Sequence, residues 1–252
     1  MRQKIAAGNW KMHKTLDEGV DLAKQINDFV NQQGAGDAKV ILAPPFIHLT
    51  EVLKVVDNPN ISVSAQNCAY EQEGAFTGEV SADMIRSTGA TYTIIGHSER
   101  RSIYKEDDET LQKKVDIALD NGLRPIFCVG ETLEERDAGK QSQVVKNQLS
   151  KGLFHLDKNV FEQVVIAYEP VWAIGTGKHA TPEQAEEMHK FIRDQVKEQY
   201  GDEIADNTSI LYGGSIKPSN AETLFSQPDV DGGLVGGASL KPEDFTEIIK
   251  AL

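Results

Sequence analysis

Cysteine is nearly absent from this sequence, which contains Cys68 and Cys128 among its 252 residues. Two thiols so far apart in the chain are too few for a disulfide framework or a structural zinc site. The first nine residues also lack the apolar core of a secretory signal peptide. We therefore expect reduced thiols in a cytoplasmic protein.

Long hydrophobic runs and positive charge are scarce as well. A typical apolar run, residues 164–168, is much shorter than the roughly 18 residues of a membrane span. Lys and Arg total 26 against 39 Asp and Glu, which gives a net charge of −13. Nucleic-acid binding requires clustered positive charge, so we expect neither a nucleic-acid partner nor a membrane location. A small anionic ligand is still compatible, because salt screens distant charges over about 8 Å and one nearby cation then dominates.

The chain contains no linker, no low-complexity tract and no shift in composition that would mark a domain boundary. Hydrophobic residues make up 39% and charged residues 26%, a balance that is typical of a folded globular protein. A barrel of alternating strands and helices takes about 250 residues. We therefore expect a single domain over residues 1–252.

Short apolar runs rich in β-forming residues recur along the chain and predict strands. There are eight, at residues 4–8, 39–43, 61–66, 92–96, 124–130, 164–168, 209–213 and 232–236. Most neighbouring runs are separated by enough residues for a crossover helix, which parallel strands require. Because the runs are apolar almost throughout, they suit strands that are buried on both faces.

The segments between these runs carry helical signals. An apolar stripe at helical spacing predicts one helix, with the members Leu16, Val20, Ala23, Ile26 and Val30. Residues 181–184 combine a capping box with a proline at the first helical position, and they predict a helix that Gly201 ends. Strand–helix units repeated in one domain predict an α/β fold, a closed (β/α)8 barrel. An open doubly wound sheet is the alternative, but no predicted strand is followed by Gly-x-Gly-x-x-Gly.

Residue types that carry chemistry follow several predicted strands, and the carboxyl ends of barrel strands gather at one rim. Asn9 and Lys11 follow the first strand, His97 follows the fourth and Glu169 follows the sixth. Glycine-rich turns follow the last two strands. Considered singly, Glu169 could be a solvated carboxylate and His97 a structural histidine.

The chemistry of these groups suits the removal of a proton from carbon beside a carbonyl. A carboxylate such as Glu169, partly desolvated beneath a closing segment, has a raised pKa and is a stronger base. A short helix that begins after His97 would disfavour the charged imidazolium. The Lys11 ammonium, about 4 Å from a developing oxyanion, would contribute about 4 kcal/mol at an effective dielectric constant of 20.

Five motifs resemble those of the triosephosphate isomerase family and occur in the family's order. They are Gly8-Asn9-Trp10-Lys11, Ile95-Gly96-His97-Ser98-Glu99-Arg100-Arg101, Ala167-Tyr168-Glu169-Pro170-Val171-Trp172-Ala173-Ile174-Gly175-Thr176-Gly177, Tyr212-Gly213-Gly214-Ser215 and Leu234-Val235-Gly236-Gly237. Together they extend over residues 8–239. The resemblance implies a TIM barrel and an isomerase of glycolysis and gluconeogenesis that interconverts dihydroxyacetone phosphate and D-glyceraldehyde 3-phosphate through an enediolate. It implies no cofactor and no metal.

The resemblance also implies a role for each residue at the rim. Glu169 takes the carbon proton, while a neutral His97 polarises the carbonyl and moves a proton between the two substrate oxygens. Lys11 supplies positive charge for the phosphate and the enediolate. Asn9 orients Lys11 and adds a hydrogen bond to the substrate.

Ser98 and Glu99, which follow His97 in the chain, are assigned as supporting residues. Glu99 is either a proton-relay partner or an ion-pair partner for Lys11 or an arginine, and we favour the ion pair. Ser98 begins the short helix that follows His97 and supports the site from there.

The glycine turns imply a phosphate site, because a backbone N–H approaches a phosphate closely only where no Cβ intervenes. The residues expected to hold the phosphate are Ser215, Gly236 and Gly237, with a further N–H donated by Gly175. Residues 170–180 form the expected lid, which excludes water and protects the enediolate. Its principal members are Pro170, Val171, Trp172, Ala173, Ile174, Gly175, Thr176 and Gly177.

The long loop at residues 66–79 resembles the family's dimer loop, with Thr77 reaching toward residues 9–11 of a second copy. The expected partners are therefore a small phosphorylated triose and another copy of the chain, in a homodimer. Two positions depart from the family pattern: His13, where Asn is common, and His179, where a smaller residue is usual. The departure at His13 is expected to affect the dimer interface, and the departure at His179 the rate at which the lid opens.

Three other functions are compatible with such a barrel. A Schiff-base aldolase would need a lysine buried inside a strand, whereas Lys4 and Lys39 begin theirs and Lys11 follows one. A metal-dependent epimerase would need ligands at several strand ends, and His97 and Glu169 are the obvious ones. A non-catalytic phosphate-binding barrel should tolerate loss of the base or the electrophile, yet both are present.

Overall fold

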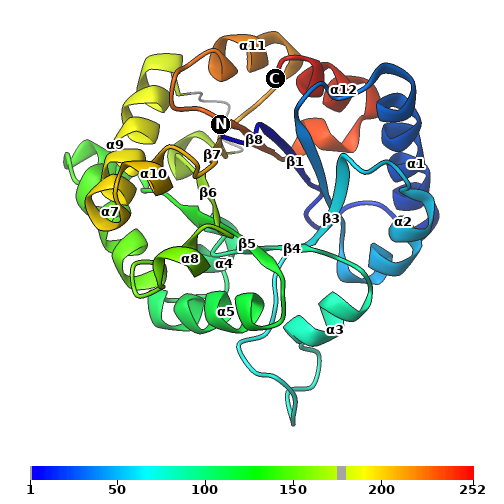
Figure 1. Cartoon of the computed structure of the whole chain (residues 1–252), viewed down its shortest axis with the longest axis horizontal. Coiled ribbons are helices and arrows are strands. Elements are labelled where there is room, and N and C mark those ends of the chain that lie inside the picture. Colours follow the sequence, from blue (N-terminus) through cyan, green and yellow to red (C-terminus); the bar gives the residue numbers. More distant parts are fainter. Residues whose placement is uncertain (1, 175–179) are drawn as a thin grey trace.

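Parallel strands form the centre of the structure and close into a barrel (Figure 1). The computed structural model describes residues 2–174 and 180–252. Within these ranges the barrel strands are β1 (Ile5–Asn9), β2 (Lys39–Ala43), β3 (Ile61–Ala65), β4 (Tyr92–Ile95), β5 (Arg124–Val129), β6 (Val165–Tyr168), β7 (Ile210–Tyr212) and β8 (Gly232–Val235). All eight predicted strands are confirmed, and each begins and ends within one residue of its predicted run.

Helices surround the barrel on its outside (Figure 1). The α-helices are α1 (Leu16–Gln33), α2 (Leu49–Val55), α3 (Ala82–Ser87), α4 (Ser98–Ser102), α5 (Asp108–Asp120), α6 (Leu133–Asp137), α7 (Gln141–Gly152), α8 (Lys158–Phe161), α9 (Pro182–Tyr200), α10 (Asp202–Ala205), α11 (Pro218–Phe225) and α12 (Pro242–Lys250). Short 3₁₀ helices are η1 (Phe46–His48), η2 (Val171–Ala173) and η3 (Gly237–Leu240). None of the helices in the described part of the chain has the length and apolar character needed to cross a membrane.

The pairing of the first and last strands closes the barrel. Each strand pairs in parallel with the next along the chain, and β1 also pairs with β8, where Ile5 lies opposite Gly232 and Gly8 opposite Val235. The (β/α)8 fold is therefore confirmed, and the open doubly wound sheet is excluded. Closure also places the residues that follow β1 beside those that follow β8.

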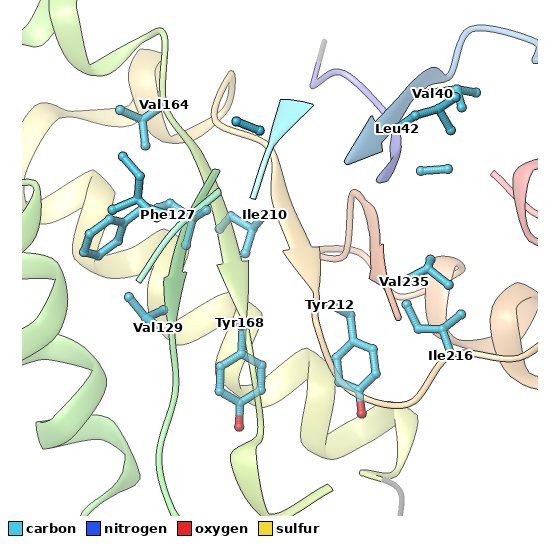
Figure 2. Packing of buried hydrophobic residues seen from close by; sticks show 14 of the residues in the cluster. Val40, Leu42, Phe127, Val129, Val164, Tyr168, Ile210, Tyr212, Ile216 and Val235 are labelled. Atoms are coloured by element: carbon cyan, nitrogen blue, oxygen red, sulfur yellow. The ribbon is translucent and has the colours of Figure 1, made fainter. Parts of the chain in front are cut away.

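Alternate residues of the strands pack into two separate hydrophobic layers, because successive side chains point to opposite faces. In β1, Ile5 and Ala7 belong to the inner cluster, whereas Ala6 belongs to the larger cluster between strands and helices. Figure 2 shows part of this larger cluster, in which Phe127, Tyr168 and other buried side chains extend from neighbouring strands. Burial on both faces explains why the strand sequences are apolar almost throughout.

Helix α9 begins and ends where its sequence signals predict. The hydroxyl of Thr181 accepts a hydrogen bond from the Gln184 N–H at 3.2 Å, and the Gln184 side chain accepts one from the Thr181 N–H at 3.0 Å. Gly201 ends the helix with a φ of 91°, a backbone angle that glycine adopts without steric cost.

The buried face of α1 differs from the predicted apolar stripe. Leu16 is exposed and Val20 is only partly buried, while the polar Asn27 lies in the buried face. The Asn27 side chain accepts hydrogen bonds from the N–H groups of Asp57 and Asn58, both at 3.2 Å. Asn27 is buried because it satisfies the backbone of the segment between α2 and β3, which hydrophobic periodicity does not detect.

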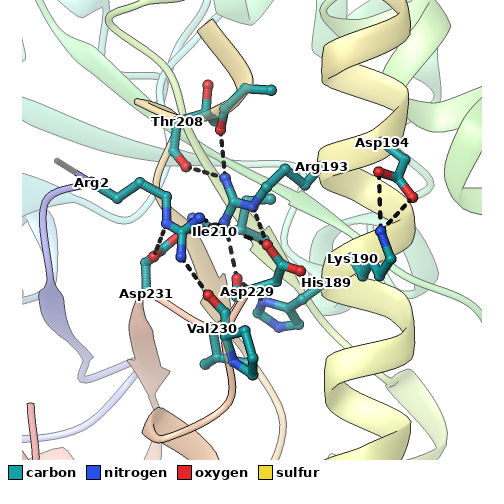
Figure 3. A network of polar contacts seen from close by, with 12 residues as sticks. Arg2, His189, Lys190, Arg193, Asp194, Thr208, Ile210, Asp229, Val230 and Asp231 are labelled. Atoms are coloured by element: carbon teal, nitrogen blue, oxygen red, sulfur yellow. Dashed lines mark hydrogen bonds and ion pairs between the residues drawn. The ribbon is translucent and has the colours of Figure 1, made fainter. Parts of the chain in front are cut away.

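A polar network joins α9 to the amino-terminal ends of the last strands (Figure 3). The Arg193 guanidinium lies 2.5 Å from an Asp229 carboxylate oxygen and 2.8 Å from one of Asp231, and it donates to the Thr208 carbonyl at 2.9 Å. Arg2 donates to the other oxygen of Asp231 at 2.7 Å. Every charge in this buried network therefore has a partner of opposite sign.

We expect Arg193→Met to lower the free energy of unfolding by about 3–5 kcal/mol, because it leaves Asp231 as a buried and incompletely paired charge. Lys190→Met is the matched control on the same helix, since Lys190 forms an exposed pair with Asp194, and such pairs contribute about 0.3–0.5 kcal/mol. Urea denaturation of both variants measures the difference. Equal losses would show that the Arg193 network does not stabilise the fold more than a surface ion pair.

Candidate active site

A cavity of about 760 Å³ opens at the carboxyl ends of the strands. Its lining comes from several strand ends that are distant in sequence, and the lining residues are Asn9, Lys11, His97, Glu99, Ile174, Leu234, Lys241, Asp244 and those at 213–219 and 236–238. The barrel thus brings together most of the site residues predicted from the sequence. Glu169 and Ser98 lie immediately beside this cavity rather than in its lining.

Lys11 has a strained backbone that its neighbours hold in place. Its φ of 52° lies in the left-handed region, which is uncommon for a residue with a side chain. The Asn9 side chain accepts a hydrogen bond from the Lys11 N–H at 3.0 Å, and Gln66 donates to the Lys11 carbonyl at 2.9 Å. The Lys11 ammonium lies 2.5 Å from a carboxylate oxygen of Glu99. Lys11 is therefore fixed at its backbone and paired at its charged end.

His97 is held in a defined orientation where β4 passes into α4. Gly96, with a φ of 76°, turns the chain at the end of the strand. His97 then caps α4, because its Nδ1 accepts a hydrogen bond from the Glu99 N–H at 3.2 Å. An accepting Nδ1 carries no proton, so the ring proton is on Nε2. This hydrogen bond agrees with the neutral ring that the resemblance implies, whereas the neighbouring Glu169 raises the pKa of His97 and favours the charged ring.

Glu169 follows β6 and its side chain is almost completely buried. Its carboxylate receives hydrogen bonds from the Ser98 N–H at 2.8 Å and the Ser98 hydroxyl at 3.2 Å. Nε2 of His97 lies 3.0 Å from Oε1 of the same carboxylate. The two groups predicted to transfer protons thus contact each other directly.

This contact changes the pKa of both groups. Burial by itself raises the pKa of Glu169, but the adjoining His97 and the hydrogen bonds from Ser98 outweigh burial and lower it. The raised pKa expected from the sequence is therefore wrong for this arrangement. Burial by itself lowers the pKa of His97, but the Glu169 carboxylate outweighs that effect and raises it. Separating the two side chains would remove the main cause of each shift.

Glu169 also helps to line a second, smaller cavity of about 210 Å³. This cavity lies among α4, the end of β5 and α7, and its lining includes Ser98, Gly130, Gln148 and Val171. To reach a ligand in the larger cavity, the carboxylate must rotate away from Ser98. Such a rotation would also remove the two hydrogen bonds that lower its pKa.

The expected phosphate residues line the larger cavity together with Lys11 and His97. A Cβ added at Gly237 would meet no atom within 4 Å, and one at Gly236 would lie 3.6 Å from the Lys11 Cε. Ser215 lines the same cavity, as do Lys217 and Lys241 at its mouth. An anion here would meet backbone N–H groups and a local excess of positive charge in a chain with a net charge of −13.

The first part of the predicted lid contacts the end of β5. Pro170 precedes η2, and the N–H of Val171 donates to the Glu131 carbonyl at 3.1 Å. The Trp172 indole donates to the Glu131 carboxylate at 2.8 Å, and Ile174 lines the larger cavity. The remaining lid residues, Gly175, Thr176 and Gly177, lie outside the described residues, as does His179.

Glu131 is a buried carboxylate that the sequence reasoning missed. Besides Trp172, it receives hydrogen bonds from the Tyr168 hydroxyl at 3.0 and 3.1 Å and from Arg136 at 3.0 Å. Glu131 directly follows the fifth apolar run, which ends at Gly130, just as Glu169 directly follows the sixth. This position after a strand is the signal that identified Glu169. Applying that signal to every strand end would have found it.

Thr77 and His13 do not line the larger cavity. Both are exposed, and Thr77 belongs to the loop at residues 66–79, which projects away from the barrel (Figure 1). Of the strand-initiating lysines considered for Schiff-base chemistry, Lys39 donates to the Pro59 carbonyl at 2.8 Å, at the opposite end of its strand from the site. In residues 2–174 and 180–252, no group of three or more His, Cys, Asp or Glu side chains is placed to hold a metal ion.

Comparisons with known proteins agree with these features. The sequence model of the family described as triosephosphate isomerase matches residues 4–252. A protein named triosephosphate isomerase from Bacteroides fragilis is 59% identical over 251 residues, covering 100% of this chain and 99% of the relative. Proteins of the same name from Phocaeicola vulgatus and Porphyromonas gingivalis are 57% and 55% identical, and the matches cover 100% of this chain and 99% and 100% of the relatives.

We expect Ser98→Ala to raise the pKa of Glu169, because the variant removes a hydroxyl that donates to the ionised carboxylate. In the unaltered protein the folded-state pKa lies below the unfolded value. Ionised Glu169 therefore stabilises the fold above its unfolded pKa, and this stabilisation is lost as the pH falls through the folded pKa. A ¹³C NMR titration of the Glu169 carboxyl measures the shift.

Ser102→Ala provides the control for that titration. Ser102 is an exposed residue of α4, and its hydroxyl donates to the Glu99 carbonyl at 3.4 Å. This variant should leave the pKa of Glu169 unchanged. An equal shift in both variants, or in neither, would mean that the Ser98 hydroxyl does not lower the pKa.

Proposed function

The chain belongs to the triosephosphate isomerase family, and we propose that it performs the family's reaction with Glu169 as the base and His97 as the group that serves the substrate oxygens. The reaction interconverts dihydroxyacetone phosphate and D-glyceraldehyde 3-phosphate. One observation carries the assignment: Glu169 and His97 lie 3.0 Å apart beside the cavity that also contains Lys11. A non-catalytic phosphate-binding barrel could lose the base or the electrophile, and this chain has both.

In the proposed mechanism, Glu169 rotates from Ser98 into the larger cavity when substrate is bound. There the carboxylate takes a proton from the carbon beside the carbonyl, and the electrons of the broken C–H bond form the enediolate. The carboxyl group then returns the proton to the neighbouring carbon. Because the rotation removes the hydrogen bonds from Ser98 while the site remains dry, the pKa of Glu169 rises and the carboxylate becomes a stronger base.

His97 donates from Nε2 to the substrate oxygens in this mechanism. The Glu99 N–H holds Nδ1 as an acceptor, which leaves Nε2 as the donor that points at Glu169 in the absence of substrate. Once Glu169 rotates away, the main influence that raises the pKa of His97 is gone, and burial then favours the neutral ring. A neutral His97 can then donate its proton to one oxygen and accept the proton of the other.

Lys11 and Asn9 are proposed to bind the negative charge of the substrate. The Lys11 ammonium exchanges Glu99 for the substrate oxyanion, which explains why Glu99 acts as an ion-pair partner rather than in proton relay. Asn9 keeps the Lys11 backbone in its strained conformation. The phosphate is proposed to lie against Ser215, Gly236 and Gly237, with the role of Gly175 remaining a prediction from the sequence.

Pro170, Val171, Trp172, Ala173 and Ile174 are proposed to form the first part of the lid. Ile174 already lines the cavity, and Trp172 and Val171 are both bonded to Glu131. A lid here would exclude water from the enediolate. Gly175, Thr176, Gly177 and any effect of His179 on lid opening remain predictions from the sequence.

We also propose that the chain forms a homodimer through the loop at residues 66–79. A hollow of about 230 Å³ beside Lys11 is lined by Met12, Phe46 and Tyr104, and Tyr104 is shared with another hollow that Phe76 lines. The exposed apolar side chains that line these hollows are Met12, Tyr70, Phe76 and Tyr104, and Ile47 and Ile103 are exposed next to the lining residues Phe46 and Tyr104 in the chain. Exposed apolar side chains beside hollows of this kind suit contact with the same surface and loop of a second copy.

A cytoplasmic location and a single catalytic domain complete the proposal. Cys68 and Cys128 are both free and buried, the state that a reducing compartment maintains, and burial raises the pKa of Cys68 to about 12. The barrel strands run from residue 5 to residue 235, so one domain supplies every proposed group. The proposed proton transfers use side chains of this chain alone.

Glu169→Gln should lower kcat for the isomerisation of D-glyceraldehyde 3-phosphate by about 10²–10⁴-fold, because the amide cannot accept the carbon proton. Glu99→Gln, which removes the ion-pair partner of Lys11, should have a much smaller effect. A coupled assay of both variants beside the unaltered protein measures the rates. Equal turnover by Glu169→Gln and the unaltered protein would mean that Glu169 is not the base, and an inactive but folded, phosphate-binding protein would favour a non-catalytic barrel.

Phe76→Glu should convert the proposed dimer into monomers, because it places a charge on an apolar contact surface. Met84→Glu is the control, since Met84 is also exposed but lies on α3, away from the two hollows. Sedimentation velocity distinguishes the two masses. A single-chain mass for the unaltered protein would contradict the homodimer.

A further inference from the structure

Gln148 holds the backbone of one glycine with both ends of its side-chain amide. Its Oε1 accepts a hydrogen bond from the Gly130 N–H at 2.8 Å, and its Nε2 donates to the Gly130 carbonyl at 3.0 Å. Gln148 lies in α7, on the outside of the barrel, whereas Gly130 directly follows β5 (Figure 1). The Gln148 amide thus makes the two hydrogen bonds that a neighbouring strand would make if β5 continued past its last residue.

Gly130 lies against the backbone of the proposed base. A Cβ added at Gly130 would come 1.7 Å from the Glu169 carbonyl oxygen, so no side chain fits between the two segments. On one side of Gly130, the Val129 carbonyl accepts a hydrogen bond from the Glu169 N–H at 2.7 Å. On the other side, the Glu131 carbonyl accepts one from the Val171 N–H at 3.1 Å. The segment 129–131 therefore supports the segment 169–171, and Gln148 holds its middle residue.

Apart from the hydrogen bonds of its neighbours Val129 and Glu131, the Gly130 peptide is held by Gln148. The glycine has no side chain of its own, and it faces the cavity of about 210 Å³ that Ser98, Gln148 and Glu169 also line. On the side of this cavity, the position of the Gly130 peptide depends on its hydrogen bonds rather than on packing. A displaced Gly130 would shift the backbone of Glu169, which it contacts directly.

We propose that Gln148 is a positioning residue for the isomerisation, which fixes the Gly130 peptide so that the Glu169 backbone stays in place while its carboxylate moves between Ser98 and the substrate. The inference depends on the proposed role of Glu169 as the base. Gln148 does not contact the substrate cavity, so its effect is on the placement of the base and not on phosphate binding. A side chain outside the barrel thereby controls the geometry of the site inside its rim.

Gln148→Met is the first test, because methionine has a similar shape but makes neither hydrogen bond. We expect kcat for D-glyceraldehyde 3-phosphate to fall by about 10- to 100-fold, since small misplacements of a reacting group have effects of this size. KM and the inhibition constant of inorganic phosphate should remain near their original values. Gln143→Met is the matched control, since Gln143 is an exposed glutamine of the same helix and donates to Asn147.

Gln148→Glu is the second test, because it should make the defect depend on pH. The ionised carboxylate keeps the acceptor for the Gly130 N–H but presents a negative oxygen to the Gly130 carbonyl. The protonated carboxyl restores both hydrogen bonds, so the kcat of the variant relative to the unaltered protein should rise as the pH falls. Glu135, Glu169 and Arg101 line the cavity that the introduced carboxyl would face, and the two carboxylates favour its protonated form.

The outcomes separate this inference from the proposed function. Unchanged kcat in Gln148→Met, or an equal fall in Gln143→Met, would overturn the positioning role of Gln148. A large loss of activity in Glu169→Gln would still support Glu169 as the base in either case. A fall in kcat that disappears when the protein is assayed well below its unfolding temperature would also overturn it, because the defect would be one of stability. Full activity of Glu169→Gln would instead refute the proposed function itself.

Discussion

The pairing of β1 with β8 is the interaction on which the site depends, because it turns a linear order of strands into a ring. Lys11 and Gly236 follow the first and the last strand, yet closure brings the Lys11 side chain to within 3.6 Å of a Cβ position at Gly236. The ammonium and the glycine turn can then act on the same anion. In an open sheet these two ends would be the most distant edges, and the carboxylate and imidazole from β6 and β4 would have no common cavity with them.

In the absence of substrate, the charges of the site are paired with one another. Lys11 contacts Glu99, and Glu169 contacts His97 and Ser98, so both carboxylates have polar partners within the described residues. Each pair also contains a group that the proposed reaction needs in a different place. Binding of substrate would therefore exchange internal partners for substrate oxygens, and the pKa of each group would change with its partner rather than with burial alone.

The proposed base, Glu169, is held by backbone more than by side chains. Gly130 and Gly213 lie against Glu169 from the ends of β5 and β7, at distances that exclude any Cβ. The peptide of Gly130 is held in turn by Gln148, and the next residue, Glu131, bonds the beginning of the proposed lid. A close backbone fit of this kind allows the Glu169 carboxylate to rotate while its Cα remains fixed, which is what a base that changes partners requires.

The sequence by itself determined the eight strands, the closed barrel and the residues that meet at its rim. These features are local: an apolar run buried on both faces ends at a glycine or polar residue, and parallel strands all end on the same side. Only the tertiary structure decided the buried face of α1, the directions of the Glu169 and His97 pKa shifts, and the contacts of Glu131 and Gln148. Each of these depends on a partner from another element, such as Asp57 for Asn27 or Gly130 for Gln148. Periodicity describes neighbours along one element, whereas hydrogen bonds and pKa values depend on what the fold places opposite them.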